Sequence, residues 1–239
     1  MFRRSITMYG VIALLLVVSI ISIQRINSVS VPVSLVTSPV DKLPVIIIDA
    51  GHGGVDGGSV GADGTMEKDI NLSIALKLRD SLELYGFETV MIREEDKSIH
   101  SDGASTIREK KVSDLHNRLN IINSTDNCIF VSIHQNYFEQ PQYSGTQVFY
   151  SPNDSQSEEL ARIMQETITR MIQPDNNRQI KEADKTLYLL SNSQKPSIMV
   201  ECGFMSNEKE LNLLKTEDYQ KQMVLCITNG ILKYMESVG

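Results

Sequence analysis

An apolar run that leads directly into a glycine-rich, histidine-bearing loop limits the fold of this chain more than any other stretch. The segment is Pro44–Gly58, PVIIIDAGHGGVDGG, in which Val45–Ile48 precedes His52. A short run rich in β-branched residues is typical of a buried strand in a parallel sheet. Ligand sites in open α/β sheets lie just beyond the carboxyl ends of strands, so the loop reads as half of a functional site. The alternative is a flexible surface turn that carries an incidental histidine.

Helix and strand patterns alternate through the rest of the chain. Thr65–Tyr85 predicts a helix, because apolar residues recur there at four-residue spacing. The polar stretch Glu94–Ser113 is expected to be a long loop. Further helices are expected over 114–123, 154–172, 208–214 and 216–235, with Ser206 as the cap of the last pair, and strands over 87–92, 128–133, 145–150 and 197–200. This alternation predicts an α/β fold, a mostly parallel sheet with helices on both faces.

The N-terminal region differs in composition from the rest. Arg3 and Arg4 precede an apolar span, Ile6–Ile23, that is about long enough to cross a hydrocarbon core of roughly 30 Å. Residues 1–25 are therefore expected to be a signal anchor, with a cleaved signal peptide as the alternative. Residues 26–43 are expected to be a linker to a catalytic domain over 44–239. The domain would then lie outside the cytoplasm, either membrane-anchored or secreted.

Charge and cysteine content argue against nucleic-acid binding and against a disulfide-stabilised fold. The net charge of −7 offers no basic stripe for phosphates, so nucleic acid is not expected as a partner. Cys128, Cys202 and Cys226 have no CxxC spacing and lie in apolar surroundings, which favours buried thiols over a disulfide. Cys202 follows Glu201 directly, and side chains alternate along a strand, so the two should point apart.

Polar side chains stand at equivalent places in this scheme and predict a zinc site. His52, His134 and Glu201 each follow an apolar strand, and Glu67 lies in the first turn of the helix after the glycine loop. Because parallel strands bring their carboxyl ends to one edge of a sheet, these residues should converge. Two imidazoles (His52, His134) and one carboxylate (Glu67) suit zinc with a fourth position left for water. Glu201 is then the candidate for the base that takes the proton of the water and returns it to the leaving amine.

Each of these residues also has a structural interpretation. His134 could be a buried histidine bonded to backbone, and Glu67 could be a glutamate favoured only by the helix dipole. Glu201 must be paired, exposed or ligating, because burial of a lone charge is costly. Asp49 could bond loop amides or orient a ligand histidine. His100 and His116 are interpreted as surface residues.

Four blocks in this order resemble the zinc-dependent N-acetylmuramoyl-L-alanine amidases of amidase type 3. They are VIIIDAGHGGVDGG, MEKDINL, FVSIHQN and SIMVECGFMSN, and the resemblance covers Val45–Met235. It implies a twisted sheet with helices on both faces, His52, Glu67 and His134 as ligands of one zinc ion, and Glu201 as the catalytic glutamate. The implied reaction is hydrolysis of the amide between N-acetylmuramic acid and L-alanine in peptidoglycan. Ala50 departs from the usual proline but removes no ligand.

The short chain narrows this resemblance. An anchor followed by a minimal catalytic domain is similar to the spore-cortex, germination-specific amidases. This resemblance implies action on cortex peptidoglycan during sporulation, before muramic-δ-lactam is formed. The implied location is the space between the spore membranes. The partners implied are glycan strands with stem peptides and the membrane; the need for an activator protein is left open. Asn136 and the segments 94–113 and 176–186 are candidates for substrate contact. The alternative functions are a peptidoglycan-binding protein of low activity and a zinc peptidase that cuts within the stem.

Overall fold

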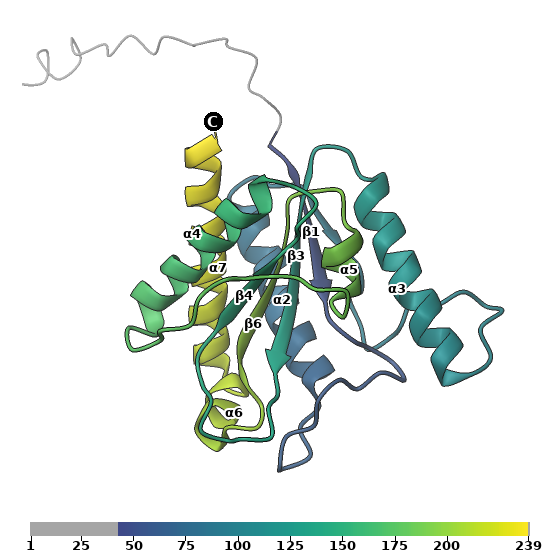
Figure 1. Ribbon diagram of the computed structural model, residues 1–239, viewed down its shortest axis with the longest axis horizontal. Helices are drawn as coiled ribbons and strands as arrows, with labels where there is room; N and C mark the ends of the chain where they lie inside the picture. The colour runs from purple at the N-terminus through teal and green to yellow at the C-terminus, as the bar shows by residue number, and fades with distance from the viewer. Residues whose placement is uncertain (1–42, 239) are drawn as a thin grey trace, which may run out of the picture. The chain divides into compact units, whose positions relative to one another are not determined.

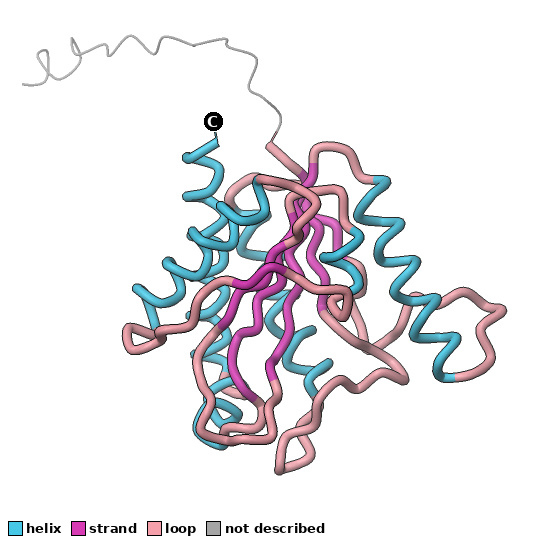
Figure 2. The backbone as a smooth tube through the Cα atoms, viewed as in Figure 1, coloured by secondary structure: helices cyan, strands magenta, loops and turns pink. Residues whose placement is uncertain are grey.

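Six strands form one sheet in the order β2-β1-β3-β6-β4-β5 (Figures 1 and 2). The computed structural model describes residues 43–238. Its strands are β1 (Val45–Ala50), β2 (Thr89–Met91), β3 (Cys128–Asn136), β4 (Gln147–Tyr150), β5 (Lys181–Glu182) and β6 (Ser197–Phe204). β1, β2, β3 and β6 are parallel, whereas β4 runs antiparallel to β6 and carries β5 beside it. The predicted α/β class and the mostly parallel sheet are confirmed.

Helices cover both faces of this sheet, as Figure 1 shows. α2 (Glu67–Leu84), α4 (Gln156–Ile172) and α7 (Glu217–Val238) pack over one face, and α3 (Ile107–Ser124) and α5 (Tyr188–Asn192) lie over the other. α6 (Glu208–Leu214) lies against β6 and α7. Alternation along β1 serves both cores: Ile46 and Ile48 join the α2 side, and Val45 and Ile47 join the α3 side. A strand buried on both faces explains the unbroken apolar run.

The α3 helix begins earlier than predicted. It starts at Ile107, so the last part of the expected loop 94–113 is helical. Thr106 caps it in a reciprocal capping box with Glu109. The helix buries only Asp114, Arg118 and Ile122, so its first turns carry no apolar stripe that a periodicity argument could detect. The Thr-x-x-Glu spacing was the available signal.

Smaller differences lie near the C-terminal end. Asn207, not Ser206, caps α6, since its side chain accepts from two backbone N–H groups. The Ser206 hydroxyl instead accepts a hydrogen bond from the Phe138 N–H. β6 continues to Phe204, beyond the predicted end of the apolar run. The short elements β5 and α5 were not predicted, because two and five residues are too few to show a period.

Two sequence predictions lie outside or at the margin of what the structure describes. The expected anchor over residues 1–25 and all but the last residue of the expected linker fall outside residues 43–238. Within the described part of the chain, no helix combines the length and apolar character needed to cross a membrane.

Candidate metal centre

The carboxyl ends of β1, β3 and β6 place the predicted polar residues at one edge of the sheet. His52 lies in the loop after β1, with a left-handed φ of 63°. His134 and Glu201 are direct partners across β3 and β6. Glu67 is the first residue of α2. Residues that are far apart along the chain therefore meet for the topological reason that the sequence suggested.

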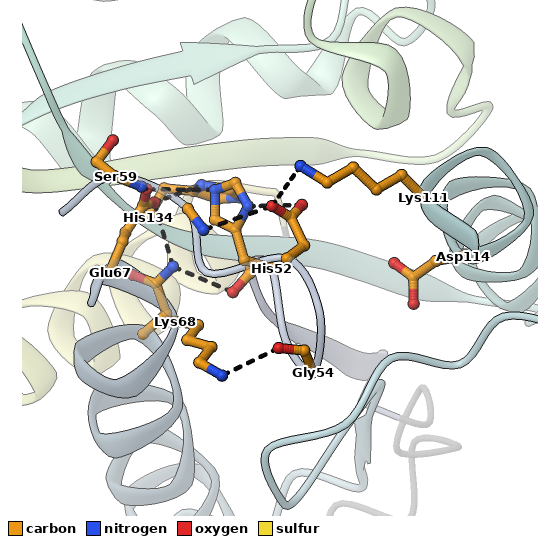
Figure 3. Close-up of polar contacts among 12 residues, drawn as sticks. His52, Gly54, Ser59, Glu67, Lys68, Lys111, Asp114 and His134 are labelled. Atoms are coloured by element: carbon orange, nitrogen blue, oxygen red, sulfur yellow. Dashed lines mark hydrogen bonds and ion pairs between the residues drawn. The ribbon is translucent and has the colours of Figure 1, made fainter. Parts of the chain in front are cut away.

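Three of these side chains form a cluster that could hold a metal ion. His52, Glu67 and His134 each offer one donor atom, and the three atoms lie within 4.8 Å of one another. His52 Nε2 is 3.2 Å from Glu67 Oε2, and His134 Nδ1 is 2.9 Å from Glu67 Oε1. Figure 3 shows the two imidazoles gathered around Glu67. Two nitrogens and one carboxylate are a donor set that suits zinc, with room left for a further ligand.

Glu67 is fixed at the centre of this cluster. Its side chain is only 2 % exposed, and it accepts hydrogen bonds from the N–H groups of Ser59 and Gln135. Burial alone would raise the pKa of Glu67, but hydrogen bonds and charge from His134 and His52 hold that pKa well below its usual range. No lysine or arginine of residues 43–238 pairs with this buried carboxylate. A buried carboxylate that two ring nitrogens face, and that no lysine or arginine neutralises, fits a metal ion.

His52 is oriented by a carboxylate that the sequence interpretation did not select. Its Nδ1 lies 2.9 Å from Asp56 Oδ2, and Lys111 of α3 in turn lies 2.7 Å from Asp56 Oδ1. This contact fixes one ring nitrogen and turns the other, Nε2, toward Glu67. Burial lowers the pKa of His52, but hydrogen bonds to Asp56 and Glu67 outweigh it and raise the pKa to about 9.

Asp49, the residue that had been considered for that role, lies beneath the loop instead. Its carboxylate binds the Arg118 guanidinium and accepts from the Ser132 hydroxyl at 2.7 Å. Arg118 also donates to the His52 carbonyl at 2.7 Å. Asp49 therefore helps to hold the backbone of His52 through Arg118. The sequence had left open whether Asp49 bonds loop amides or a histidine, and its partners are neither.

Two glycines allow the cluster to close. A Cβ on Gly51 would lie 2.1 Å from His134 Nε2, so any side chain there would displace that imidazole. A Cβ on Gly58 would lie 2.6 Å from Glu67 Oε2, and Gly58 has a positive φ of 69°. Close approach of backbone to the donor atoms therefore explains glycine at these positions.

Glu201 lies beside the cluster without being one of the three close donors. Its Oε2 is buried and has no hydrogen-bond partner among the described residues. Burial raises the pKa of Glu201 to about 7, with a further contribution from the Glu67 carboxylate. Cys202 points to the opposite side of the sheet, into the apolar core, as predicted. A buried carboxylate oxygen without a partner, on a residue that lines a cavity, marks a candidate functional group.

A cavity of about 440 Å³ opens over these residues. The predicted metal ligands and Glu201 line it, and so do Asn136, the candidate for substrate contact, and Tyr137. α3 forms one wall, and residues 186–189 contribute another. Parts of both segments that were candidates for substrate contact also line the cavity: Ser98, Lys110 and Lys111 from 94–113, and Thr186 from 176–186. His100 and His116 do not line the cavity, and His116 is exposed.

A profile of the N-acetylmuramoyl-L-alanine amidases matches residues 46–233, which is nearly the whole described unit. The chain belongs to the N-acetylmuramoyl-L-alanine amidase family. The germination-specific amidase of Bacillus subtilis is 34% identical over 195 residues, which cover 82% of this chain and 81% of that protein. Family membership makes the chain a hydrolase that acts on peptidoglycan.

Solved structures of the family share the fold. The CwlD amidase from Clostridioides difficile, determined in complex with the GerS lipoprotein, is 44% identical with a TM-score of 0.78, and the match covers 81% of this chain and 99% of that one. AmiC2 of Nostoc punctiforme is 32% identical with a TM-score of 0.69, and the match covers 82% and 98%. The amidase fold therefore accounts for the whole described unit.

Proposed function

We propose that this amidase is zinc-dependent and that it cleaves the amide between N-acetylmuramic acid and L-alanine. The observation that carries the proposal is the cluster of His52, Glu67 and His134, whose buried carboxylate has no lysine or arginine partner among residues 43–238, with Glu201 lining the same cavity. His52, Glu67 and His134 would hold the ion. Glu201 stays outside that donor set and is available for proton transfer.

The residues of this chain divide the chemistry between them. A bound zinc ion would supply positive charge that acidifies water and polarises the scissile carbonyl. Glu201 takes the proton of the attacking water and delivers it to the leaving nitrogen of L-alanine, so one carboxylate acts first as base and then as acid. A pKa near 7 suits both steps, because the group gains and loses a proton at small cost near neutral pH.

Substrate contacts would come from the rim of the cavity. Asn136 lies two residues beyond His134 and lines the same cavity, where its amide can bond the peptide backbone of the stem. Two separate segments of the chain, α3 and residues 186–189, line this cavity together with the proposed metal ligands.

The biological setting is part of the proposal. Likeness to a germination-specific amidase and to CwlD supports spore-cortex peptidoglycan as the substrate, on the route to muramic-δ-lactam. Residues 1–25 would anchor the enzyme, or direct its secretion, and residues 26–43 would link them to the catalytic unit outside the cytoplasm. Because the C. difficile protein was determined with a lipoprotein, an accessory protein is also proposed for this chain.

Digestion of purified peptidoglycan by the full-length protein tests the reaction and its metal. We expect release of intact stem peptides beginning with L-alanine, loss of release after chelation, and recovery with zinc. Mass spectrometry of the products separates this outcome from cleavage within the stem, which would leave L-alanine on the glycan. Activity that is indifferent to the chelator, in protein shown by elemental analysis to be metal-free, would contradict zinc dependence.

A further inference from the structure

Three cationic side chains of α3 line the cavity, and two of them are already paired. Arg118 binds Asp49, and Lys111 binds Asp56. Lys110 lines the same cavity, yet its ammonium group has no hydrogen bond or ion pair with any residue of the described range 43–238. In a chain of net charge −7, a cation without a partner at the mouth of the catalytic cavity requires an explanation.

The carboxylate that helix spacing would give to Lys110 is occupied elsewhere. Asp114 lies one turn further along α3, the usual position for a stabilising pair. Its Oδ1 accepts from the Ile99 N–H at 2.6 Å, and its Oδ2 accepts from Arg118 Nε at 2.6 Å. Lys110, which is half-buried and lines the cavity, therefore has no ion-pair partner within its own helix.

The surroundings leave this charge available to a ligand. The facing wall, Thr186–Leu189, is uncharged. On the floor, Asp56 already pairs with Lys111 and His52, and Glu67 is bonded to both imidazoles. Among the described residues that line the cavity, Lys110 is the lysine or arginine that has no anionic partner. An anionic group that enters the cavity can therefore pair with it.

Geometry relates this position to the reacting bond. Lys111, the next residue of α3, lies 2.7 Å from Asp56 Oδ1, and Asp56 Oδ2 lies 2.9 Å from His52 Nδ1. Lys110 precedes Lys111 in the same turn of α3 and lines the same cavity as the proposed metal ligands. In a peptidoglycan stem, the residue after L-alanine is a glutamate with a free carboxylate. An extended chain advances about 3.3–3.6 Å per residue, so this carboxylate lies roughly 7 Å from the scissile amide.

We propose that Lys110 is a positioning residue that binds the free carboxylate of the second stem residue and so selects acidic over amidated stems. The inference rests on the proposed function, since it places the scissile amide at the His52–Glu67–His134 cluster. The ammonium group would direct the stem along the α3 wall and leave the glycan on the other side of the cluster. Selectivity comes from one charge-assisted hydrogen bond that an amidated stem cannot form.

Two soluble substrates that differ in one group test this assignment. Both are glycan strands with tripeptide stems, L-alanyl-γ-D-glutamyl-L-lysine in one and L-alanyl-γ-D-isoglutaminyl-L-lysine in the other, so that the γ-carboxyl of the second residue is in a peptide bond in both and only the α-carboxyl differs. The full-length zinc-loaded protein and its K110Q, K110R and R108Q variants are compared on both. Arg108 is a matched control, because it is an exposed cation of the same helix that does not line the cavity.

We expect K110Q to lower kcat/KM on the acidic stem by about tenfold, the lower end for a hydrogen bond to a charged group, chiefly through KM. Turnover of the amidated stem should stay unchanged, K110R should restore the preference, and R108Q should resemble the wild type. An equal loss on both substrates, no loss, or the same loss in R108Q would overturn the assignment while leaving the amidase function intact. If the wild type cleaves neither strand, the proposed function fails and the assignment falls with it.

Discussion

The two faces of the sheet differ in the size of their apolar cores. The face under α2, α4 and α7 is a large, continuous apolar core. The face under α3 and α5 has a much smaller apolar cluster, and next to it lie the buried groups Asp49, Arg118 and Ser132. His134 and Glu201 project on this second side, toward the cavity. Most of the apolar packing is thus on one face. The other face provides His134 and Glu201, which are costly to bury but needed for chemistry, and only Glu67 reaches the site from the start of α2.

The largest effect is expected where the second face meets the substrate. Replacing Glu201 by glutamine should lower hydrolysis by about 10²–10⁴-fold, because the proton acceptor is lost while the side chain keeps its shape. Zinc content should not change, since Glu201 lies outside the donor cluster. The variant should be as stable as the wild type or more stable in thermal unfolding. Glutamine cannot ionise, so the variant no longer buries an ionisable group whose Oε2 has no hydrogen-bond partner. Wild-type turnover in E201Q, or loss of its zinc, would show that Glu201 has another role.

The same contrast explains what could be predicted from the sequence. His52, His134 and Glu201 could be predicted because each follows an apolar run that forms a strand. The carboxyl ends of parallel strands lie at one edge of a sheet, so these residues meet there whatever the exact strand order. Asp56 was not predicted to orient His52, although it lies only four residues later in the sequence. The two residues are joined by a glycine-rich loop, and such a loop has no hydrophobic periodicity from which its conformation could be predicted. The partners of Asp49 could not be predicted either. Arg118 is 69 residues away in the sequence, and it lies on α3, a largely polar helix that shows no clear apolar periodicity in its first turns.

The next effect concerns the buried charges that support the loop. Replacing Arg118 by methionine should destabilise the protein by about 3–5 kcal/mol at pH 7, because it leaves Asp49 buried and unpaired. Burial would raise the pKa of Asp49, but charge and hydrogen bonds from Arg118 help to keep that pKa below its ordinary value. A depressed pKa stabilises the folded state above about pH 4 and loses that contribution as the pH falls.

Urea unfolding of wild type and R118M at two pH values checks this sign. The difference in unfolding free energy should be largest at pH 7. It should narrow as the pH falls through about 4, where Asp49 is protonated in the unfolded chains and, without Arg118, also in folded R118M. An R118M deficit that stays constant with pH would mean that lost packing of the Arg118 side chain, rather than charge, is responsible.

On the apolar face, a substitution should affect stability alone. Leu78 of α2 is fully buried, and its replacement by alanine should cost about 2–5 kcal/mol. Leu78 lies 11 residues after Glu67 in the same helix, or about 16 Å along its axis. Zinc affinity and kcat of the folded protein should therefore remain those of the wild type when measured well below the lowered unfolding temperature. A parallel loss of zinc affinity would show that the two faces are coupled through α2.

The smallest effect tests how far the metal cluster depends on the polar groups around it. Replacing Asp56 by alanine removes the acceptor of His52 Nδ1 and should weaken zinc binding by about 10–100-fold. Because Asp56 also helps to raise the pKa of His52, its loss makes the imidazole easier to deprotonate, which places the net effect at pH 7 nearer the tenfold end. Asp63→Ala is the matched control, since Asp63 is another ion-paired loop aspartate, bound to Lys215 and not to an imidazole. Competition with a chelating dye gives both affinities; equal losses in D56A and D63A would mean that general loosening of the loop, and not the orientation of His52, governs the site.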